Sequence, residues 1–297
     1  MTELATPAPN PHPSPGNPGP HPAPSRPSLV LPPGATDAHC HVFGPASRFP
    51  YAPGRTFTPV DVPYSRVQST QRALGFERAV IVQSSGYGTD HRALLDALRS
   101  DPASLRGVAL LGPGVDPAEL DAAGVCGARL HFLDHLGGAP DPTRIRTSLD
   151  TIAEMGWHAE IHVQGLGIVE HAPMIAAIRS RVVIDHMARV DLHDGVDGPA
   201  VRALSRLLDR GNIWVKLSGA DRVSLSGPPY HDAAALAALL VDRFPERVLW
   251  GTDFPHVNIT GPAPDDGLLV DLLTEMAPTE SLRHRLLVTN PTDLFGF

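Results

Sequence analysis

Short runs of β-branched and apolar residues alternate along the chain with longer stretches whose apolar positions recur every three or four residues. The short runs predict buried strands, and the longer stretches predict amphipathic helices. The eight predicted strands are Ala35–His39, Ala79–Gln83, Gly107–Leu110, Ala128–Phe132, His158–Val163, Val182–His186, Ile213–Ser218 and Val248–Asp253. The predicted helices are Thr89–Ser100, Pro117–Ala123, Thr143–Met155, Ile168–Ile178, Pro199–Asp209, Asp232–Phe244, Asp265–Met276 and Thr279–Val288.

This alternation of strand and helix with short connections predicts a parallel sheet. Eight such units in about 260 residues is the size of a closed (β/α)8 TIM barrel. The alternative is an open, doubly wound sheet, in which a glycine-rich dinucleotide-binding sequence would follow the first strand, and Ala35–His39 is followed by none. We therefore expect one α/β domain, a TIM barrel over residues 34–297. The Gly44–Pro63 segment is long for a βα connection and predicts a lid or pocket wall.

Residues 1–33 precede the first predicted strand and contain 12 of the 32 prolines of the chain. The rest of this segment is mostly Ala, Ser, Asn, Gly and His. Such a composition buries too little apolar surface to offset the entropy of ordering, so a disordered or polyproline-like tail is expected.

The formal net charge of −8 argues against nucleic acid or an anionic membrane as a partner, because both are bound by clustered Lys and Arg. Two cysteines are too few for a disulfide framework, and the N-terminus lacks the basic and apolar stretches of a signal peptide. A cytoplasmic protein is expected. A homodimer stays open, because the outer helices of a barrel carry apolar residues in monomers and dimers alike.

Reactive side chains gather at the carboxyl ends of the predicted strands, which converge on one mouth in a barrel. They are His39 and His41, Gln83 and Ser84, Arg129 and His131, His162, His186, Lys216 and Ser218, and Asp253. Two imidazoles spaced two residues apart on a strand point to the same side and can face one ion or one substrate oxygen. Asp37 points the same way from deeper in the barrel and is expected to orient one of these rings.

The order of these residues, His-x-His, His, His and Asp, on the first, fifth, sixth and eighth strands resembles the amidohydrolase superfamily. Further sequence segments narrow the resemblance to one branch of that superfamily. They are AVIVQSS at 79–85, HLGGAPD at 135–141, VKLSGADR at 215–222, GTDFPH at 251–256 and NPTDLFGF at 290–297. Together these are similar to the branch that contains 2-pyrone-4,6-dicarboxylate lactonase and 4-sulfomuconolactone hydrolase.

The resemblance implies a hydrolase that opens an acidic lactone from the breakdown of aromatic compounds. Asp253 would be the general base that takes a proton from water and returns one to the leaving oxygen. His39, His41 and His186 would stabilise the negative charge that develops on the lactone carbonyl, directly or through a metal.

The resemblance also implies a set of substrate-binding residues. Arg129 and Arg222 would hold carboxylate or sulfonate groups, because a guanidinium matches two of their oxygens. Ser84 and His256 correspond to positions that line the pocket in this branch. His135 stands where the dicarboxylate lactonase has an arginine. It is therefore expected near an acid group of the substrate, but to bind that group more weakly than an arginine would.

The metal-free lactonase of this branch has Tyr near the end of the fifth strand, where this chain has His162. His39, His41, His162 and Asp253 are therefore expected to bind one divalent ion, Zn²⁺ or less strongly Mn²⁺, while a metal-free mechanism stays open. Phe57 also replaces the commoner tyrosine. These departures favour an enzyme of the sulfomuconolactone hydrolase type over one that acts on the pyrone dicarboxylate.

Three alternatives stay open. The first is a metal-dependent, non-oxidative decarboxylase of an aromatic or muconate-type acid. The second is a lactone isomerase, and the third is a binding protein without activity.

Overall fold

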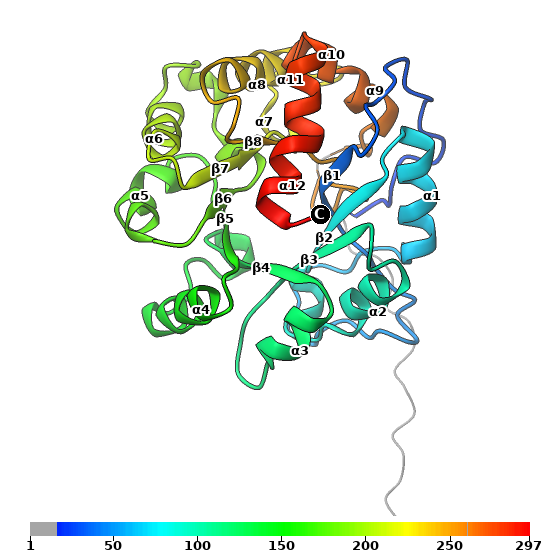
Figure 1. The fold of residues 1–297 in the computed structure, drawn as a ribbon, viewed down its shortest axis with the longest axis vertical. Coiled ribbons are helices and arrows are strands. Elements are labelled where there is room, and N and C mark those ends of the chain that lie inside the picture. Colours follow the sequence, from blue (N-terminus) through cyan, green and yellow to red (C-terminus); the bar gives the residue numbers. More distant parts are fainter. Residues whose placement is uncertain (1–16, 260) are drawn as a thin grey trace, which may run out of the picture.

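The computed structural model describes residues 17–259 and 261–297. Eight parallel strands follow one another around a barrel in chain order (Figure 1). They are β1 (Thr36–Cys40), β2 (Arg78–Val82), β3 (Leu105–Ala109), β4 (Val125–His131), β5 (His158–His162), β6 (Val182–Ile184), β7 (Ile213–Lys216) and β8 (Val248–Leu249). Backbone bonds from Ala38 to Trp250, and between His39 and Asp253, join the first strand to the segment after the last one. The predicted TIM barrel is confirmed.

Helices surround the strands on the outside of the barrel (Figure 1). They are α1 (Tyr64–Leu74), α2 (Arg92–Ser100), α3 (Pro117–Ala122), α4 (Pro142–Glu154), α5 (Gly167–Ala177), α6 (Pro199–Leu208), α7 (Ala220–Val223), α8 (His231–Arg243), α9 (Asp266–Asp271), α10 (Leu273–Met276), α11 (Glu280–His284) and α12 (Asn290–Phe295). Asp116 and Asp141 accept hydrogen bonds from the first-turn amides of α3 and α4, which both begin with proline. The sequence pattern missed α1, in which only four of eleven residues are buried.

The amino ends of the strands are closed by the C-terminal helix, which crosses the front of the barrel in Figure 1. Leu294 and Phe295 of α12 pack with Val80, Val183 and Trp214 from inside the barrel. We call this apolar group, completed by Ala38, Val82, Val108 and Leu249, the floor cluster. It fills the interior below the carboxyl ends of the strands.

Residues 17–33 form neither helix nor strand, but they contact the barrel. The backbone N–H and the hydroxyl of Ser25 donate to Asp265, just before α9, and the amides of Ser28 and Leu29 donate to Asp271. This differs from the free tail expected from composition, because local carboxylates satisfy the backbone. The disorder predicted for residues 1–16, which lie outside the described residues, and the domain boundary at residue 34 stay predictions.

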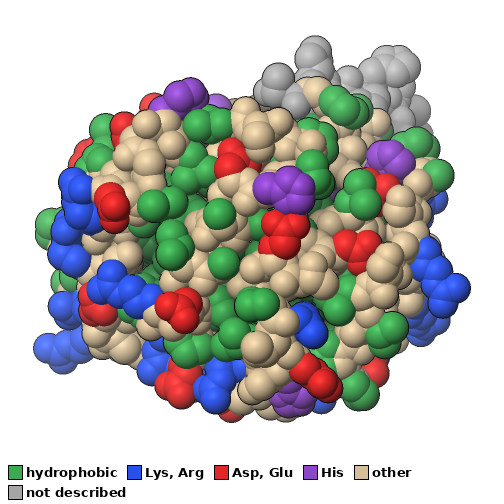
Figure 2. Space-filling view, turned by 90° about the horizontal axis from the view of Figure 1, so that it is seen from above, with side chains coloured by type: hydrophobic (Ala, Val, Ile, Leu, Met, Phe, Trp, Pro, Cys, Tyr) green, Lys and Arg blue, Asp and Glu red, His purple; other side chains and the backbone are tan. Residues whose placement is uncertain are grey.

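The outer surface mixes charges of both signs. On the face seen in Figure 2, basic, acidic and apolar side chains are interspersed, and the described residues there form no continuous basic patch. Among the described residues, no helix has the length and hydropathy needed to cross a membrane.

Candidate active site

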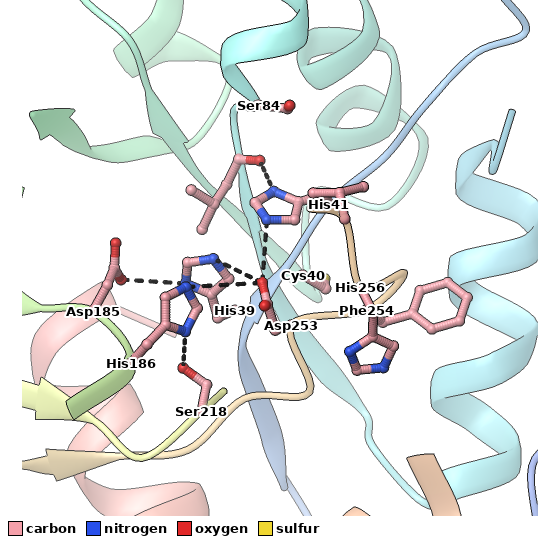
Figure 3. A network of polar contacts seen from close by, with 12 residues as sticks. His39, Cys40, His41, Ser84, Asp185, His186, Ser218, Asp253, Phe254 and His256 are labelled. Atoms are coloured by element: carbon pink, nitrogen blue, oxygen red, sulfur yellow. Dashed lines mark hydrogen bonds and ion pairs between the residues drawn. The ribbon is translucent and has the colours of Figure 1, made fainter. Parts of the chain in front are cut away.

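One carboxylate oxygen, Oδ1 of Asp253, faces three imidazoles at the carboxyl ends of the strands (Figure 3). The Nε2 atoms of His41, His39 and His186 lie 3.4, 3.6 and 3.9 Å from it. All four side chains are buried. The structure thus brings together the four residues that the sequence predicts to be catalytic.

Two of these residues stand in left-handed backbone, just beyond their strands. The φ angles of His186 and Asp253 are +49° and +62°. The strands β6 and β8 end before them, at Ile184 and Leu249, earlier than the pattern predicts. A non-glycine residue in this region costs free energy and persists only where its surroundings over-determine it. Here the backbone turns away from the strand and directs both side chains towards the same point.

The second oxygen of Asp253 is held by Arg222. Nε and Nη2 of Arg222 donate to Oδ2 at 2.9 and 2.6 Å, and its other donors reach the carbonyls of Val257 and Asn258. Burial alone would raise the pKa of Asp253, but Arg222 and the imidazoles outweigh it and hold that pKa well below its usual range. The carboxylate is therefore ionised at neutral pH, and Arg222 contacts it rather than standing free for a substrate acid.

The two rings of the His-x-His pair have different partners behind them. Nδ1–H of His41 donates to the carbonyl of Val82 at 2.8 Å, so in the neutral ring the lone pair is on Nε2. Nδ1 of His39 lies 3.0 Å from Lys216 Nζ and 3.3 Å from Asp185 Oδ1. Burial, reinforced by nearby cations, holds the pKa of His39 well below its usual range, so the ring is neutral.

The expectation that Asp37 orients one of these rings is wrong. Its Oδ1 accepts from the backbone amides of His39 and Thr252, and its Oδ2 accepts from the Thr252 hydroxyl. Asp37 therefore joins the first strand to the segment after the last one. The carboxylate nearest to Nδ1 of His39 is that of Asp185, at 3.3 Å, which the sequence pattern placed in a strand without assigning it a role.

The atoms of His39, His41 and Asp253 that could bind a metal all lie within 4.8 Å of one another, and so do those of His39, Asp185 and His186. His162 belongs to neither group. Its Nδ1 lies 3.2 Å from Nδ1 of His131, and its ring is 5.3 Å from that of His186. The structure thus brings three of the four expected metal ligands together, with the His162 ring beside them rather than among them.

A pocket opens over this cluster, and most of the predicted substrate-binding residues line it. Arg129, Arg222, Ser84 and His135 all do so, together with His41, His162, His186 and Asp253. Phe57 lines it as well, so the Gly44–Pro63 segment contributes to the pocket wall as expected. Nε of Arg129 donates to Asp185 at 2.7 Å, while its buried Nη2 has no hydrogen-bond partner among the described residues.

His256 does not line this pocket. Its Nε2 bonds to Asp266 Oδ1 at 2.9 Å, and both side chains are fully buried. Burial would lower the pKa of His256, but the Asp266 carboxylate outweighs it and raises that pKa. In Figure 3 the His256 ring lies apart from the imidazoles around Asp253. Its predicted contact with substrate stays a prediction that the geometry does not favour.

Arg189 is a pocket residue that the sequence analysis missed. It ends η3 (His186–Arg189), four residues that all have positive φ. Its guanidinium lines the pocket, and its buried Nε has no hydrogen-bond partner within residues 17–259 and 261–297. Burial, followed by repulsion from Arg222, lowers the pKa of Arg189 to about 10. No periodicity or motif indicates it, because the turn that redirects the chain after β6 has no simple sequence signature.

Beneath the imidazoles lies a layer of four buried charged residues, which we call the charged layer: Arg129, Glu160, Asp185 and Lys216. Lys216 contacts Glu160 and lies 3.5 Å from Asp185. Arg129 lies 2.7 Å from Asp185 and 3.5 Å from Glu160. Two cations and two anions balance, which offsets the large cost of burying each charge alone.

Comparisons with known proteins agree with this geometry. Residues 36–297 match the family model described as amidohydrolase. The chain is 39% identical over 294 residues to 2-pyrone-4,6-dicarboxylate hydrolase of Comamonas testosteroni, covering 95% of this chain and 96% of that protein. It is 37% identical to 4-sulfomuconolactone hydrolase of Hydrogenophaga intermedia, covering 90% of each.

A solved structure gives the same result. An apo crystal structure from Agrobacterium tumefaciens superposes with a TM-score of 0.81 at 31% identity, over 91% of this chain and 98% of the other. The relatives therefore span nearly the whole described barrel.

Proposed function

The chain belongs to the amidohydrolase family, and from that premise we propose that it hydrolyses a small anionic lactone with Asp253 as general base. The observation that carries the proposal is the convergence of three imidazole nitrogens on Asp253 Oδ1, under a pocket with incompletely bonded guanidinium groups. The named relatives act on a dicarboxylate pyrone and a sulfonated lactone, whose negative charges match such a pocket.

Asp253 would position the attacking water and accept its proton. Its Oδ1 faces the imidazoles, while Arg222 holds Oδ2 and so restricts rotation of the carboxylate. As the water oxygen bonds to the lactone carbonyl carbon, its proton passes to Oδ1. The ring C–O bond then breaks, and the same proton moves to the leaving oxygen.

The imidazoles would stabilise the negative charge that develops on the carbonyl oxygen. His186 Nδ1 is 2.9 Å from the hydroxyl of Ser218, which orients its Nε2 towards the pocket. A ring nitrogen that carries a proton there donates to the oxyanion in a buried site, where such a bond is stronger than in water.

The site also fits a divalent cation. His39 Nε2 is buried without a hydrogen-bond partner among the described residues, and the carbonyl of Val82 leaves the Nε2 lone pair of His41 free. His39, His41 and Asp253 would hold the ion, and their donor types favour Zn²⁺, with Mn²⁺ second. A bound ion would polarise the carbonyl and acidify water. Whether His162 completes the set is tested by measuring the zinc content of wild type and His162→Tyr.

Arg189 and Arg129 would bind the acid group of the substrate. Arg189 Nε and Arg129 Nη2 are both buried and lack partners in the described part of the chain. A carboxylate or sulfonate supplies acceptors for both guanidinium groups, and such charge-assisted bonds are about twice as strong as neutral ones.

The proposal is tested by incubating the protein with 4-sulfomuconolactone and with 2-pyrone-4,6-dicarboxylate in H₂¹⁸O. Ring opening that places one ¹⁸O in the new carboxylate is the expected result. A product that keeps the ring would indicate an isomerase, and released carbon dioxide would indicate a decarboxylase; either result contradicts the proposal. An uncharged 2-pyrone serves as control, and it should react at least about a hundredfold more slowly because it leaves the arginines unpaired.

A further inference from the structure

The Nδ1 atom of His39 is close to both a hydrogen-bond donor and an acceptor, and both of these groups are fully buried. Lys216 Nζ, which can only donate, is 3.0 Å away, and Asp185 Oδ1, which can only accept, is 3.3 Å away. In Figure 3 Asp185 lies on one side of the His39 ring and Asp253 on the other. The proton distribution on this ring therefore depends on which neighbour Nδ1 bonds to.

The other two imidazoles differ in this respect. The carbonyl of Val82 can only accept, so the proton of His41 is confined to Nδ1. The hydroxyl of Ser218 can donate or accept, so it does not select a tautomer of His186. Only His39 of these three has a dedicated donor and a dedicated acceptor at the same nitrogen.

We propose that Lys216 and Asp185 are positioning residues that select the tautomer of His39. In the ion-free protein, Lys216 donates to Nδ1 and leaves the ring proton on Nε2, which faces Asp253 and the substrate carbonyl. A divalent cation held by His39, His41 and Asp253 would need the Nε2 lone pair of His39, so the ring proton would stand on Nδ1 and donate a hydrogen bond to Asp185 Oδ1. This inference rests on the proposed function, since it concerns how the same site would polarise a lactone with or without a cation.

The unused acceptor supports this assignment. Asp185 Oδ1 is buried and makes no hydrogen bond within the described part of the chain, although it lies 3.5 Å from the Lys216 ammonium and Oδ2 of the same carboxylate bonds to Arg129. A buried acceptor without a partner costs free energy. A proton on His39 Nδ1 would give Asp185 Oδ1 a hydrogen bond, so the site can also accommodate the tautomer that is protonated at Nδ1.

The choice of lysine also fits this role. Lys216 is the only lysine among the 24 basic residues of the chain. Its compact ammonium has three donors, which reach Glu160 and His39 from one fully buried position. Lys216 and Arg129 balance Glu160 and Asp185, so the proton shift within His39 requires no change in the charge of this layer.

The first test measures the tautomer directly in the wild-type protein. Two-bond ¹H–¹⁵N spectra of ¹⁵N-histidine-labelled protein distinguish a protonated from an unprotonated ring nitrogen, and His39→Gln identifies the His39 signals by their loss. We expect Nε2 of His39 to be protonated after metal removal and unprotonated once one equivalent of Zn²⁺ is added. An unprotonated Nε2 in the metal-stripped protein would overturn the proposal, and this measurement needs no variant of Lys216 or Asp185.

The second test uses a charge-matched pair of variants. Lys216→Met with Glu160→Gln removes one cation and one anion, so the charge of the layer stays balanced while the donor to Nδ1 is lost. We expect this variant to show an unprotonated Nε2 without any metal, and to bind Zn²⁺ about tenfold more tightly in competition with a chromophoric chelator. Glu160→Gln alone keeps Lys216 and should keep the wild-type tautomer. A double variant that retains the wild-type tautomer contradicts the role of Lys216.

These measurements need no substrate. A tautomer that responds as expected in a protein that hydrolyses no lactone would leave this inference standing and remove the proposed function. If the protein hydrolyses the lactone but the His39 tautomer changes neither with the Lys216 substitution nor with Zn²⁺, the proposed function stands and this inference is wrong.

Discussion

The floor cluster and the charged layer are adjacent levels of the same barrel interior, and they are built from opposite kinds of residue. Alternate positions of one strand reach both levels: on β7, Trp214 belongs to the floor cluster and Lys216 to the charged layer. Below, Leu294 and Phe295 of α12 fill the space with carbon. Above, no apolar side chain could replace Arg129 or Glu160 without leaving an opposite charge unpaired.

The difference shows how one fold separates stability from chemistry. The floor cluster stabilises through apolar burial, which tolerates no polar group and provides no reactive one. The charged layer is a costly arrangement that gives little net stability, yet it determines the charge around the imidazoles above it. We therefore expect substitutions at the two levels to affect different measurements.

The largest expected effect is that of Asp253→Asn at the mouth. The amide keeps the size of the carboxylate but cannot accept the proton of water, so turnover should fall by about a thousandfold or more. Steady-state hydrolysis of the lactone and a thermal unfolding curve would be measured together. More than a tenth of the activity remaining would exclude Asp253 as the base.

At the floor, Leu294→Ala should reduce stability and leave chemistry alone. Leu294 is 6% exposed, and truncating a buried leucine costs about 2–5 kcal/mol. Leu268→Ala is the matched control, because that side chain is 46% exposed and its loss should change stability by less than about 0.5 kcal/mol. Urea unfolding measures both. A large loss of kcat in Leu294→Ala, at a temperature where it is folded, would show that the two levels are coupled.

Arg189→Met should weaken substrate binding. Loss of a charge-assisted bond of about 1.5–3 kcal/mol corresponds to a rise in KM of roughly tenfold to a hundredfold, with a smaller change in kcat. Arg243→Met provides the control, since Arg243 pairs with Asp209 on the surface outside the pocket. An unchanged KM in Arg189→Met would leave Arg129 as the residue that binds the acid group.

The smallest expected effect is a change in stability with pH at His256. Asp266 raises the folded-state pKa of His256 above the ordinary 6.5, despite the opposing effect of burial. Because the folded protein binds this proton more tightly, the contribution to stability is complete below pH 6.5 and is lost as the pH rises through the folded-state pKa. Unfolding midpoints between pH 6 and 9 should fall less in His256→Gln than in wild type. Parallel slopes for the two proteins would contradict this coupling.

The sequence by itself determined the barrel and the identity of most of the site. Periods of two and of three to four gave the eight strands and most of the helices, because burial on one face imposes that spacing. Strand ends carrying His39, His41, His186 and Asp253 indicated the mouth, since parallel strands in a barrel end on the same side. The resemblance to amidohydrolases then suggested the roles that are proposed for these residues.

The tertiary structure alone decided which side chains touch. It pairs Arg222 with Asp253 and leaves Arg189 Nε and Arg129 Nη2 without hydrogen-bond partners among the described residues, whereas the sequence analysis named Arg129 and Arg222 for substrate binding and did not identify Arg189. It also brings both Asp185 and Lys216 to one nitrogen of His39, at 3.3 and 3.0 Å. Such contacts join strands far apart in the chain and depend on turns in left-handed backbone, so they follow from closure of the barrel and not from any local pattern.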